Sequence, residues 1–131
     1  MGTAENKKIA LAYMQDISTG NTEGMLNAMA EHGTVWVAGE VPGLSGKKTK
    51  PELAKTLAHL GDYFPNGVKL TADNVIAEGD YVAVEGSSYA DLGGGKIYRN
   101  TIHWAFKIRG GKIESFKEYL DPMKLKAAFG G

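Results

Sequence analysis

Apolar residues recur at helical spacing near the start of the chain. Ile9, Tyr13 and Ile17 lie at positions i, i+4 and i+8, so they fall on one side of a helix. Gly20 follows them, and a glycine at such a position commonly ends a helix. The pattern therefore predicts a helix over residues 3–18.

Two more helices are predicted in the first half of the chain. Asn21 or Thr22 can cap a short helix that has an apolar side. That side carries Met25, Leu26 and Met29. Pro51 suits the first turn of a third helix, which Gly61 is expected to end. The apolar stripe of this third helix consists of Leu53, Leu57 and Leu60.

The second half of the chain has the character of strands. β-Branched and aromatic residues already predict one strand over 34–38. Turns rich in glycine then separate four longer segments, which predict an antiparallel meander. These segments are residues 68–77, 80–90, 96–108 and 112–120, and a closing helical turn is expected over 123–129. Helices followed by strands indicate one α+β domain over residues 1–131, with three N-terminal helices on the concave side of a curved, mainly antiparallel sheet.

The composition narrows the classes of function. Fifteen basic residues balance fifteen acidic ones in the 131-residue chain, so no net charge attracts nucleic acid. No cysteine is present, which excludes disulfides and thiolate chemistry and fits the cytoplasm, where we expect the protein. Residues 1–11 contain charged side chains and no long apolar run, so we expect neither a signal peptide nor a membrane span.

The three histidines are dispersed along the chain. His32, His59 and His103 form no i, i+4 pair and have no flanking cluster of carboxylates. Metal sites need several ligands brought together, so no metal is expected. The remaining classes are an enzyme, a small-molecule binding module and an interaction domain.

The register of the last predicted hairpin decides which of its side chains face inward. A three-residue turn with Gly111 in the left-handed conformation places Ile108 opposite Lys112. A two-residue turn would instead bring His103 opposite Glu118 and mix charged and apolar groups on both faces. Because register normally keeps one face of a sheet dry, we expect the three-residue turn.

In this register, one face of the hairpin is apolar apart from a single carboxylate, Glu118. Its other members are Ile102, Trp104, Phe106, Phe116 and Leu120. Burial disfavours a charged carboxylate, so Glu118 should be harder to ionise than a surface glutamate, and it is a candidate general acid or base. The structural alternative is a strand-end glutamate that reaches water or a backbone amide.

Several segments together resemble one superfamily. They are Tyr13 on the first helix, "STGNTEGMLNAMAEHGTVWV", "VPGLSGKK" and "GKIESFKEYLDPMKLKAAFG". From about Asn6 to Phe129 the chain is similar to the nuclear transport factor 2-like superfamily, which includes SnoaL-like polyketide cyclases, ketosteroid isomerase and limonene epoxide hydrolase. The resemblance implies a cone-shaped α+β barrel of the cystatin-like type with a deep apolar pocket.

The resemblance also implies roles for individual residues. Tyr13 matches the tyrosine with which ketosteroid isomerase donates a hydrogen bond to the substrate oxygen, but Val37 stands in place of that enzyme's proton-shuttling aspartate. Glu118 matches the final-strand aspartate of limonene epoxide hydrolase, whereas Glu85 and Ser87 replace its Arg-x-Asp pair. Steroid-type isomerisation and epoxide hydrolysis are therefore disfavoured. SnoaL-like cyclases use a single acidic residue as acid and base and need no metal or cofactor. Of the mechanisms in the superfamily, this is the one that the residues of this chain contradict least.

These arguments predict a SnoaL-like pocket protein that acts on a small apolar carbonyl compound as an isomerase or cyclase without a cofactor. Glu118 would transfer the proton and Tyr13 would polarise the carbonyl oxygen. The expected pocket lining comprises Val37, Trp104, Phe106, Phe116, Leu120, Ile102 and Glu85. For Glu85 the simpler alternative is that its side chain is exposed at the edge of the sheet.

A second hypothesis belongs to a different class, because a fold alone does not confer function. It is a non-catalytic module of the same fold that binds a hydrophobic ligand or a partner, and it is motivated by the missing catalytic positions. Under either hypothesis we expect a homodimer, formed through the outer face of the sheet. We expect that face to include Thr101, Ala105, Ile113 and Tyr119.

Overall fold

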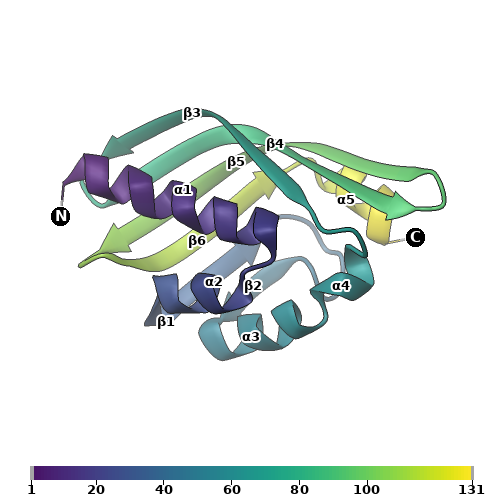
Figure 1. Cartoon of the computed structure of the whole chain (residues 1–131), viewed down its shortest axis with the longest axis horizontal. Helices are drawn as coiled ribbons and strands as arrows, with labels where there is room; N and C mark the ends of the chain where they lie inside the picture. Colours follow the sequence, from purple (N-terminus) through teal and green to yellow (C-terminus); the bar gives the residue numbers. More distant parts are fainter. Residues whose placement is uncertain (1, 131) are drawn as a thin grey trace.

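Groups of helices and groups of strands follow one another along residues 2–130, the part of the chain that this computed structural model describes (Figure 1). The helices are α1 (Thr3–Thr19), α2 (Thr22–Ala28), α3 (Lys50–Ala58), α4 (Leu60–Tyr63) and α5 (Pro122–Phe129). The strands are β1 (Met29–Val37), β2 (Gly46–Thr49), β3 (Lys69–Glu78), β4 (Tyr81–Gly93), β5 (Lys96–Arg109) and β6 (Lys112–Leu120).

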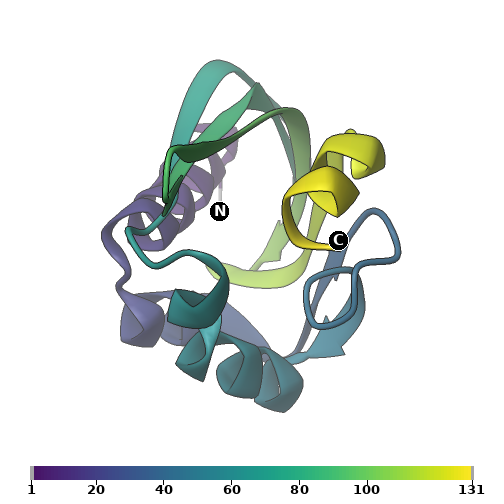
Figure 2. The ribbon, with the colours of Figure 1, turned by 90° about the vertical axis from the view of Figure 1, so that its right-hand side faces the viewer.

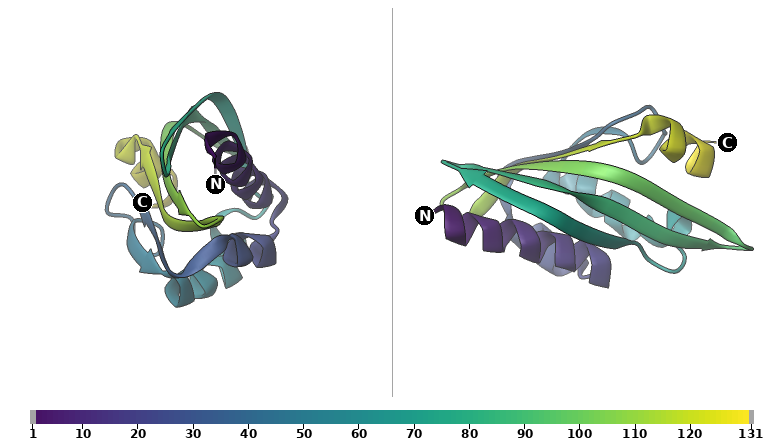
Figure 3. Two further views of the ribbon diagram at one scale, coloured as in Figure 1. Left: turned by 90° about the vertical axis from the view of Figure 1, so that its left-hand side faces the viewer. Right: turned by 90° about the horizontal axis from the view of Figure 1, so that it is seen from above.

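All these strands form one sheet in the order β2-β1-β6-β5-β4-β3. β1 and β6 run parallel and every other neighbouring pair is antiparallel, so the predicted mainly antiparallel α+β fold is confirmed. The sheet bends around an interior that the N-terminal helices cover (Figure 2). The long β4–β5 hairpin and α5 lie together at the end of the molecule away from the N-terminus (Figures 1 and 3).

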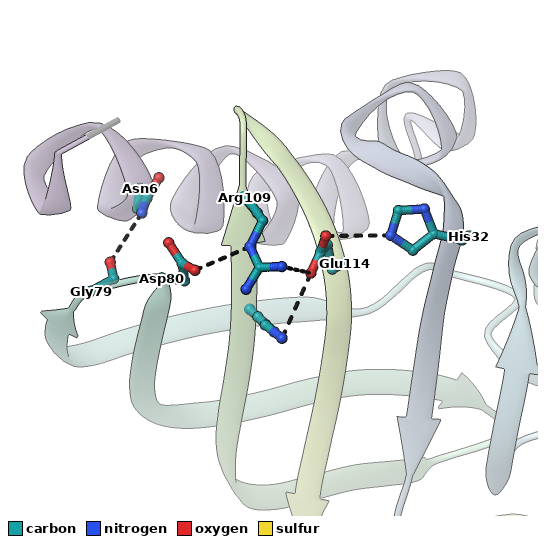
Figure 4. Close-up of polar contacts among 7 residues, drawn as sticks. Asn6, His32, Gly79, Asp80, Arg109 and Glu114 are labelled. Carbon is teal, nitrogen blue, oxygen red and sulfur yellow. Dashed lines mark hydrogen bonds and ion pairs between the residues drawn. The ribbon is translucent and has the colours of Figure 1, made fainter.

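Helix α1 packs inside the curve of the sheet through its predicted apolar side. The Tyr13 ring lies edge-on to Phe106 of β5, with ring centroids 6.0 Å apart, and tilted against Phe116 of β6 at 5.0 Å. At the helix start, buried Asn6 donates through Nδ2 to the Gly79 carbonyl in the β3–β4 turn (3.4 Å, Figure 4). Gly20 ends the helix as predicted, with φ of 73°, the left-handed conformation that is common at helix ends.

Two of the helix predictions need correction. Met29 begins β1 instead of lying in α2, and its side chain is equally buried in the strand. The third predicted helix is divided at His59 into α3 and α4, and Gly61 lies inside α4. Hydrophobicity could not show either difference, because it reports burial and not the backbone conformation.

Strand β2 occupies residues that the sequence pattern left in a loop. Its four residues, GKKT, carry no apolar alternation, and β2 pairs only with β1 at the sheet edge. The segment ends in a reciprocal cap that begins α3. Thr49 Oγ1 accepts from the Glu52 backbone N–H, and the Glu52 carboxylate accepts from the Thr49 backbone N–H (3.0 Å).

The turn between β5 and β6 has two residues, so the expected three-residue turn is wrong. Gly110 and Gly111 have φ of 58° and 79°, and Arg109 pairs with Lys112 on either side of them. Positive φ at both central residues is the type I′ geometry that suits the twist of a hairpin. Ile108 consequently lies opposite Ile113 instead of Lys112.

A β-bulge then restores the inward face that was predicted. Glu114 is the extra residue, because Ile108 pairs with Ile113 whereas Lys107 pairs with Ser115. Beyond the bulge Trp104 lies directly opposite Glu118, so both share the inner face. The two-residue turn, which pairs Ile113 with buried Ile108, points Ile113 inward, where it is fully buried, so its expected place on the outer face is wrong.

The bulge residue lies among charged side chains at the end of the sheet (Figure 4). The Glu114 carboxylate is 3.3 Å from His32 Nε2, 3.8 Å from Lys107 Nζ and 3.9 Å from Arg109 Nη1. Arg109 Nε also lies 3.3 Å from the carboxylate of Asp80 in the β3–β4 turn. These contacts hold the extra residue away from the apolar interior.

The interior contains two clusters of buried apolar side chains. The larger one joins α1, α2 and α3 to the centre of the sheet around Trp104, Tyr13 and Phe106. The smaller one lies under α5 and contains Tyr98 and Leu125. The two clusters meet beneath β6, and this boundary positions the site described next.

We expect Gly86 to be indispensable, because a Cβ at this position would overlap the backbone carbonyl of Thr71 and crowd the Trp104 ring. Gly86→Ala should lower the free energy of unfolding by about 3 kcal/mol, the cost typical of a badly overpacked core. Urea unfolding measures this change. Gly61→Ala is the control, since a Cβ there meets no atom within 4 Å and should be neutral or slightly stabilising. Equal effects of the two variants would contradict the assigned packing.

Candidate active-site cavity

A cavity of about 140 Å³ lies where the two apolar clusters meet. An apolar cavity of about 150 Å³ can hold a benzene molecule, so there is room for a ligand of roughly one ring. Most of the wall is aliphatic or aromatic. It is lined by Tyr13, Ile17, Met25, Val35, Val37, Leu44, Lys48, Leu53, Thr56, Leu57, Leu60, Phe64, Val68, Leu70, Ser88, Tyr98, Ile102, Phe116, Glu118 and Leu125.

Glu118 supplies the carboxyl group of this wall. It lies on β6 between Trp104 of β5 and Val37 of β1, is partly buried, and lines the cavity. Trp104 Nε1 donates a hydrogen bond to Glu118 Oε1 at 2.8 Å. Because the indole ring is fully buried, this hydrogen bond holds the carboxyl in one orientation.

Burial raises the pKa of Glu118 above its ordinary value, because the apolar surroundings disfavour the charged form. The hydrogen bond from Trp104 favours the charged form and opposes this shift, but burial has the larger effect. A carboxyl group with a raised pKa is a stronger base once it is ionised. Its position beside a cavity is typical of groups that transfer protons.

Tyr13 places its hydroxyl-bearing ring on the same cavity from helix α1. The side chain is 1% exposed, and burial raises the pKa of the hydroxyl far above its ordinary value. The negative charge of Glu118, which lines the same cavity, raises the pKa further. The hydroxyl therefore stays protonated and available as a hydrogen-bond donor.

A second set of polar groups comes from β4 and β5. Ser88 and Tyr98 line the cavity, and Asn100, which pairs with Ser88, lies behind them. Asn100 Nδ2 donates to the Tyr98 hydroxyl oxygen at 2.8 Å. Burial raises the pKa of Tyr98, and the charge of Glu118 contributes in the same direction. Within residues 2–130, buried Ser88 Oγ makes no hydrogen bond of good geometry, but it lies close enough to the Tyr98 hydroxyl to lower the pKa of Tyr98, against the effect of burial.

Lys48 of β2 brings a cation to the wall. Its ammonium group makes one long contact with the Leu44 carbonyl, at 3.5 Å. Partial burial lowers the pKa of Lys48, while the charge of Glu52 acts in the opposite direction.

The structure places several of the residues expected from the sequence on the cavity wall. They are Tyr13, Val37, Ile102, Phe116 and Glu118. Others lie behind the wall instead of on it. Trp104 holds Glu118, Phe106 packs against the Tyr13 and Phe116 rings, and Leu120 packs against both apolar clusters.

Glu85 differs from its expected position. It is exposed on the outer face of β4, where its carboxylate accepts from Asn74 Nδ2 at 3.4 Å. The inward positions of β4 are even-numbered, as the buried residues Val82, Val84 and Ser88 show. Because β4 is paired with β3 and β5, Glu85 is exposed on the outer face of the sheet and not at its edge, and it does not line the cavity.

The sequence-based argument missed the polar residues Lys48, Ser88 and Tyr98. Strand alternation could have found two of them, because Ser88 has the parity of Val82 and Val84, and Tyr98 that of Ile102. Lys48 carried no such signal, because its strand was not predicted.

Two kinds of feature are not found in the part of the chain that the structure covers. Among residues 2–130, no three His, Asp or Glu side chains come together in a group that could hold a metal ion. No helix in the same range is long and apolar enough to cross a membrane.

This architecture and its cavity agree with a known family. The SnoaL-like domain model matches residues 10–116, so the chain belongs to the SnoaL-like domain family. The resemblance seen in the sequence is thereby confirmed. No curated protein matches the chain.

Solved structures share the fold across their whole length. A nuclear transport factor 2-like protein from Burkholderia xenovorans LB400 is 24% identical, with a TM-score of 0.78 and 98% of each chain covered. TerC, co-crystallised with polyporic acid, is 21% identical, with a TM-score of 0.85 over 97% of this chain and 99% of TerC. A protein of unknown function with a cystatin-like fold from Xanthomonas campestris is 20% identical, with a TM-score of 0.85 over 100% of both chains.

The buried carboxyl predicts a specific dependence of stability on pH. Because the pKa of Glu118 is raised on folding, the folded protein binds its proton more tightly than the unfolded chain does. The contribution of Glu118 to the free energy of unfolding is therefore most favourable below pH 4.5, the ordinary pKa, and is lost as pH rises through the raised value. Each tenfold weakening of the acid on folding changes this contribution to the free energy of unfolding by about 1.4 kcal/mol.

Glu118→Gln removes this titration and keeps the shape of the side chain. Relative to the wild type, the variant should gain stability as pH rises from 4 to 9 in a series of urea unfolding curves. Glu85→Gln, at the exposed position on β4, should follow the wild type at every pH. A stability difference between Glu118→Gln and the wild type that stays constant with pH would contradict the assigned environment of Glu118.

Proposed function

We propose that this SnoaL-like protein is an acid/base enzyme that needs no cofactor and acts as an isomerase or cyclase on a small apolar carbonyl compound. One observation carries the proposal: a single carboxyl group, Glu118, lines a mostly apolar cavity that the protonated hydroxyl-bearing ring of Tyr13 also lines. Apolar walls favour a hydrophobic substrate, and the two polar groups fix where its carbonyl lies.

The proposed reaction begins with removal of a proton. The ionised Glu118 carboxylate takes a hydrogen from the carbon next to the carbonyl, and the electrons of the broken C–H bond form an enolate. The Tyr13 O–H donates a hydrogen bond to the enolate oxygen, where negative charge develops. In a β,γ-unsaturated compound the resulting dienolate takes the proton back from Glu118 at the γ-carbon, which moves the double bond. In a dicarbonyl compound the enolate carbon instead attacks the second carbonyl carbon, and the alkoxide that forms takes the proton from Glu118.

The surroundings of both groups favour this chemistry. A raised pKa makes Glu118 a stronger base than a surface glutamate. This narrows the difference between the pKa of Glu118 and that of the weakly acidic C–H bond. The Trp104 hydrogen bond holds the carboxyl in place, so little reorganisation accompanies proton transfer. TerC, which shares the fold, has been co-crystallised with the organic molecule polyporic acid, and this is a precedent for a small organic ligand.

Proton exchange tests the proposal without knowledge of the natural substrate. Cyclohexanone fits a cavity of one ring, and NMR in D₂O follows the replacement of its α-hydrogens by deuterium. The wild type should accelerate this exchange. Glu118→Gln should lose about 10²–10⁴-fold of the acceleration, which is the usual contribution of a positioned base.

Glu85→Gln is the matched control, because it removes a carboxylate from the outer face of the same sheet. Its exchange rate should equal that of the wild type. If the wild type binds cyclohexanone without accelerating exchange, the non-catalytic ligand-binding hypothesis replaces this one. Val37, which offers no second carboxylate beside Glu118, is the observation that favours that hypothesis.

We further propose a homodimer that forms through the outer face of the sheet. This face carries exposed aromatic side chains: Tyr81 is 59% and Tyr119 45% exposed, and Trp36 packs against Tyr119 with ring centroids 5.0 Å apart. Such rings are typical of the buried centre of an interface.

Light scattering after gel filtration tests this assembly, since one chain has a mass of 14.0 kDa. The wild type should elute at twice that mass, and Tyr119→Glu should shift it to the monomer. Met123→Glu changes an exposed apolar side chain on α5 and should leave the dimer intact. A wild-type protein that is monomeric at all concentrations would refute the dimer.

A further inference from the structure

The end of the cavity below α5 contains polar groups that the proposed proton transfer does not use. Ser88 and Tyr98 belong to neighbouring strands, and both line the cavity, with Tyr98 packed in the same cluster as Leu125 of α5. The charge of Glu118 raises the pKa of Tyr98 as well as that of Tyr13. Tyr13, Ser88, Tyr98 and Glu118 all line this one cavity of about 140 Å³, so a ligand inside it lies between the two sets of groups.

The direction of the hydrogen bonds at Tyr98 is determined by the backbone. Asn100 Oδ1 accepts from the Asp121 N–H at 3.1 Å, and Asn100 Nδ2 donates to the Asp121 carbonyl at 3.0 Å. A reversed amide would place oxygen against oxygen and N–H against N–H, so the orientation of Asn100 is unique. Its second Nδ2 hydrogen goes to the Tyr98 oxygen at 2.8 Å. The Tyr98 oxygen is thus an acceptor toward Asn100, which leaves the Tyr98 proton to donate to the nearby Ser88 hydroxyl or to a group in the cavity.

Ser88 adds a second available hydroxyl. The residue is 4% exposed, and within residues 2–130 its Oγ makes no hydrogen bond of good geometry, although the Tyr98 hydroxyl lies close enough for Ser88 to lower the pKa of Tyr98. The Tyr98 oxygen already accepts from Asn100, so whichever of the two hydroxyls donates to the other, one O–H proton of the pair stays free to donate to a group in the cavity.

We propose that Ser88 and Tyr98 form a second oxygen-binding subsite, which selects ligands carrying two oxygen functions on one small ring. The first oxygen, a carbonyl, lies at Tyr13 and Glu118. The second, a carbonyl or hydroxyl oxygen, accepts from the Tyr98 O–H and pairs with the Ser88 hydroxyl. This inference rests on the proposed function in taking the cavity as the substrate site, and it defines the substrate class as oxygenated at both ends.

The test compares cyclohexanone with cyclohexane-1,4-dione, which differ by one carbonyl on the same ring. NMR titration gives the dissociation constant of each compound. For the wild type, the dione should bind about tenfold more tightly, as expected for added hydrogen bonds inside a cavity. Ser88→Ala and Tyr98→Phe should each reduce this preference about threefold to tenfold, mainly by weakening dione binding.

Two control variants lie on the same strand, with side chains that are not on the cavity wall. Ser87→Ala neighbours Ser88, and Tyr89→Phe removes a hydroxyl from an exposed ring on β4. Both should keep the wild-type preference. Ser88→Ala should also unfold at the same or a higher temperature than the wild type, whereas a purely structural serine would lower the melting temperature when replaced.

The outcomes separate this inference from the proposed function. If Glu118-dependent exchange of cyclohexanone occurs but the wild type shows no preference for the dione, the second subsite is refuted and the proposed function stands. A preference that survives both Ser88→Ala and Tyr98→Phe refutes the subsite in the same way. If neither compound binds or exchanges, the cavity is not a carbonyl site and both proposals fail.

Discussion

The parity of strand β6 is the constraint on which the rest of this structure depends. A type I′ turn alone would continue a register in which the apolar and charged faces of the last hairpin are mixed. The bulge at Glu114 absorbs one residue, so Phe116 and Glu118 return to the face of Trp104. The charges around Glu114 hold the extra residue at the surface, and the carboxyl of Glu118 thereby enters the interior.

Burial of a charged carboxyl opposes folding unless neighbouring groups form hydrogen bonds with it. The two sides of the Glu118 carboxyl differ in this respect. Trp104 provides a short hydrogen bond from behind, while the front of the carboxyl faces the cavity. Phenols from α1 and β5 lie within range of its charge, and both remain protonated because they are buried as well. The site therefore combines one group that can exchange a proton with hydroxyls that donate hydrogen bonds.

The cavity exists because two apolar clusters meet without filling the space between them. The larger cluster forms under α1, and the smaller one forms where α5 covers the end of the β4–β5 hairpin (Figures 1 and 3). Lys96 Nζ donates to the Ala128 carbonyl at 2.7 Å and helps to hold α5 there. A ligand of about one ring would complete the packing between the clusters and contact the polar groups of both.

Local pattern by itself determined the succession of helices and strands, the meander and the inward face that carries Trp104 and Glu118, because these depend on spacing along one segment. Tertiary structure decided what depends on pairing between segments: the two-residue turn with its bulge, edge strand β2, and the outward position of Glu85. It also brought Ser88 and Tyr98 to the cavity of Glu118. Residues from five or more elements converge there only after the sheet has curved, and no local pattern records that curvature.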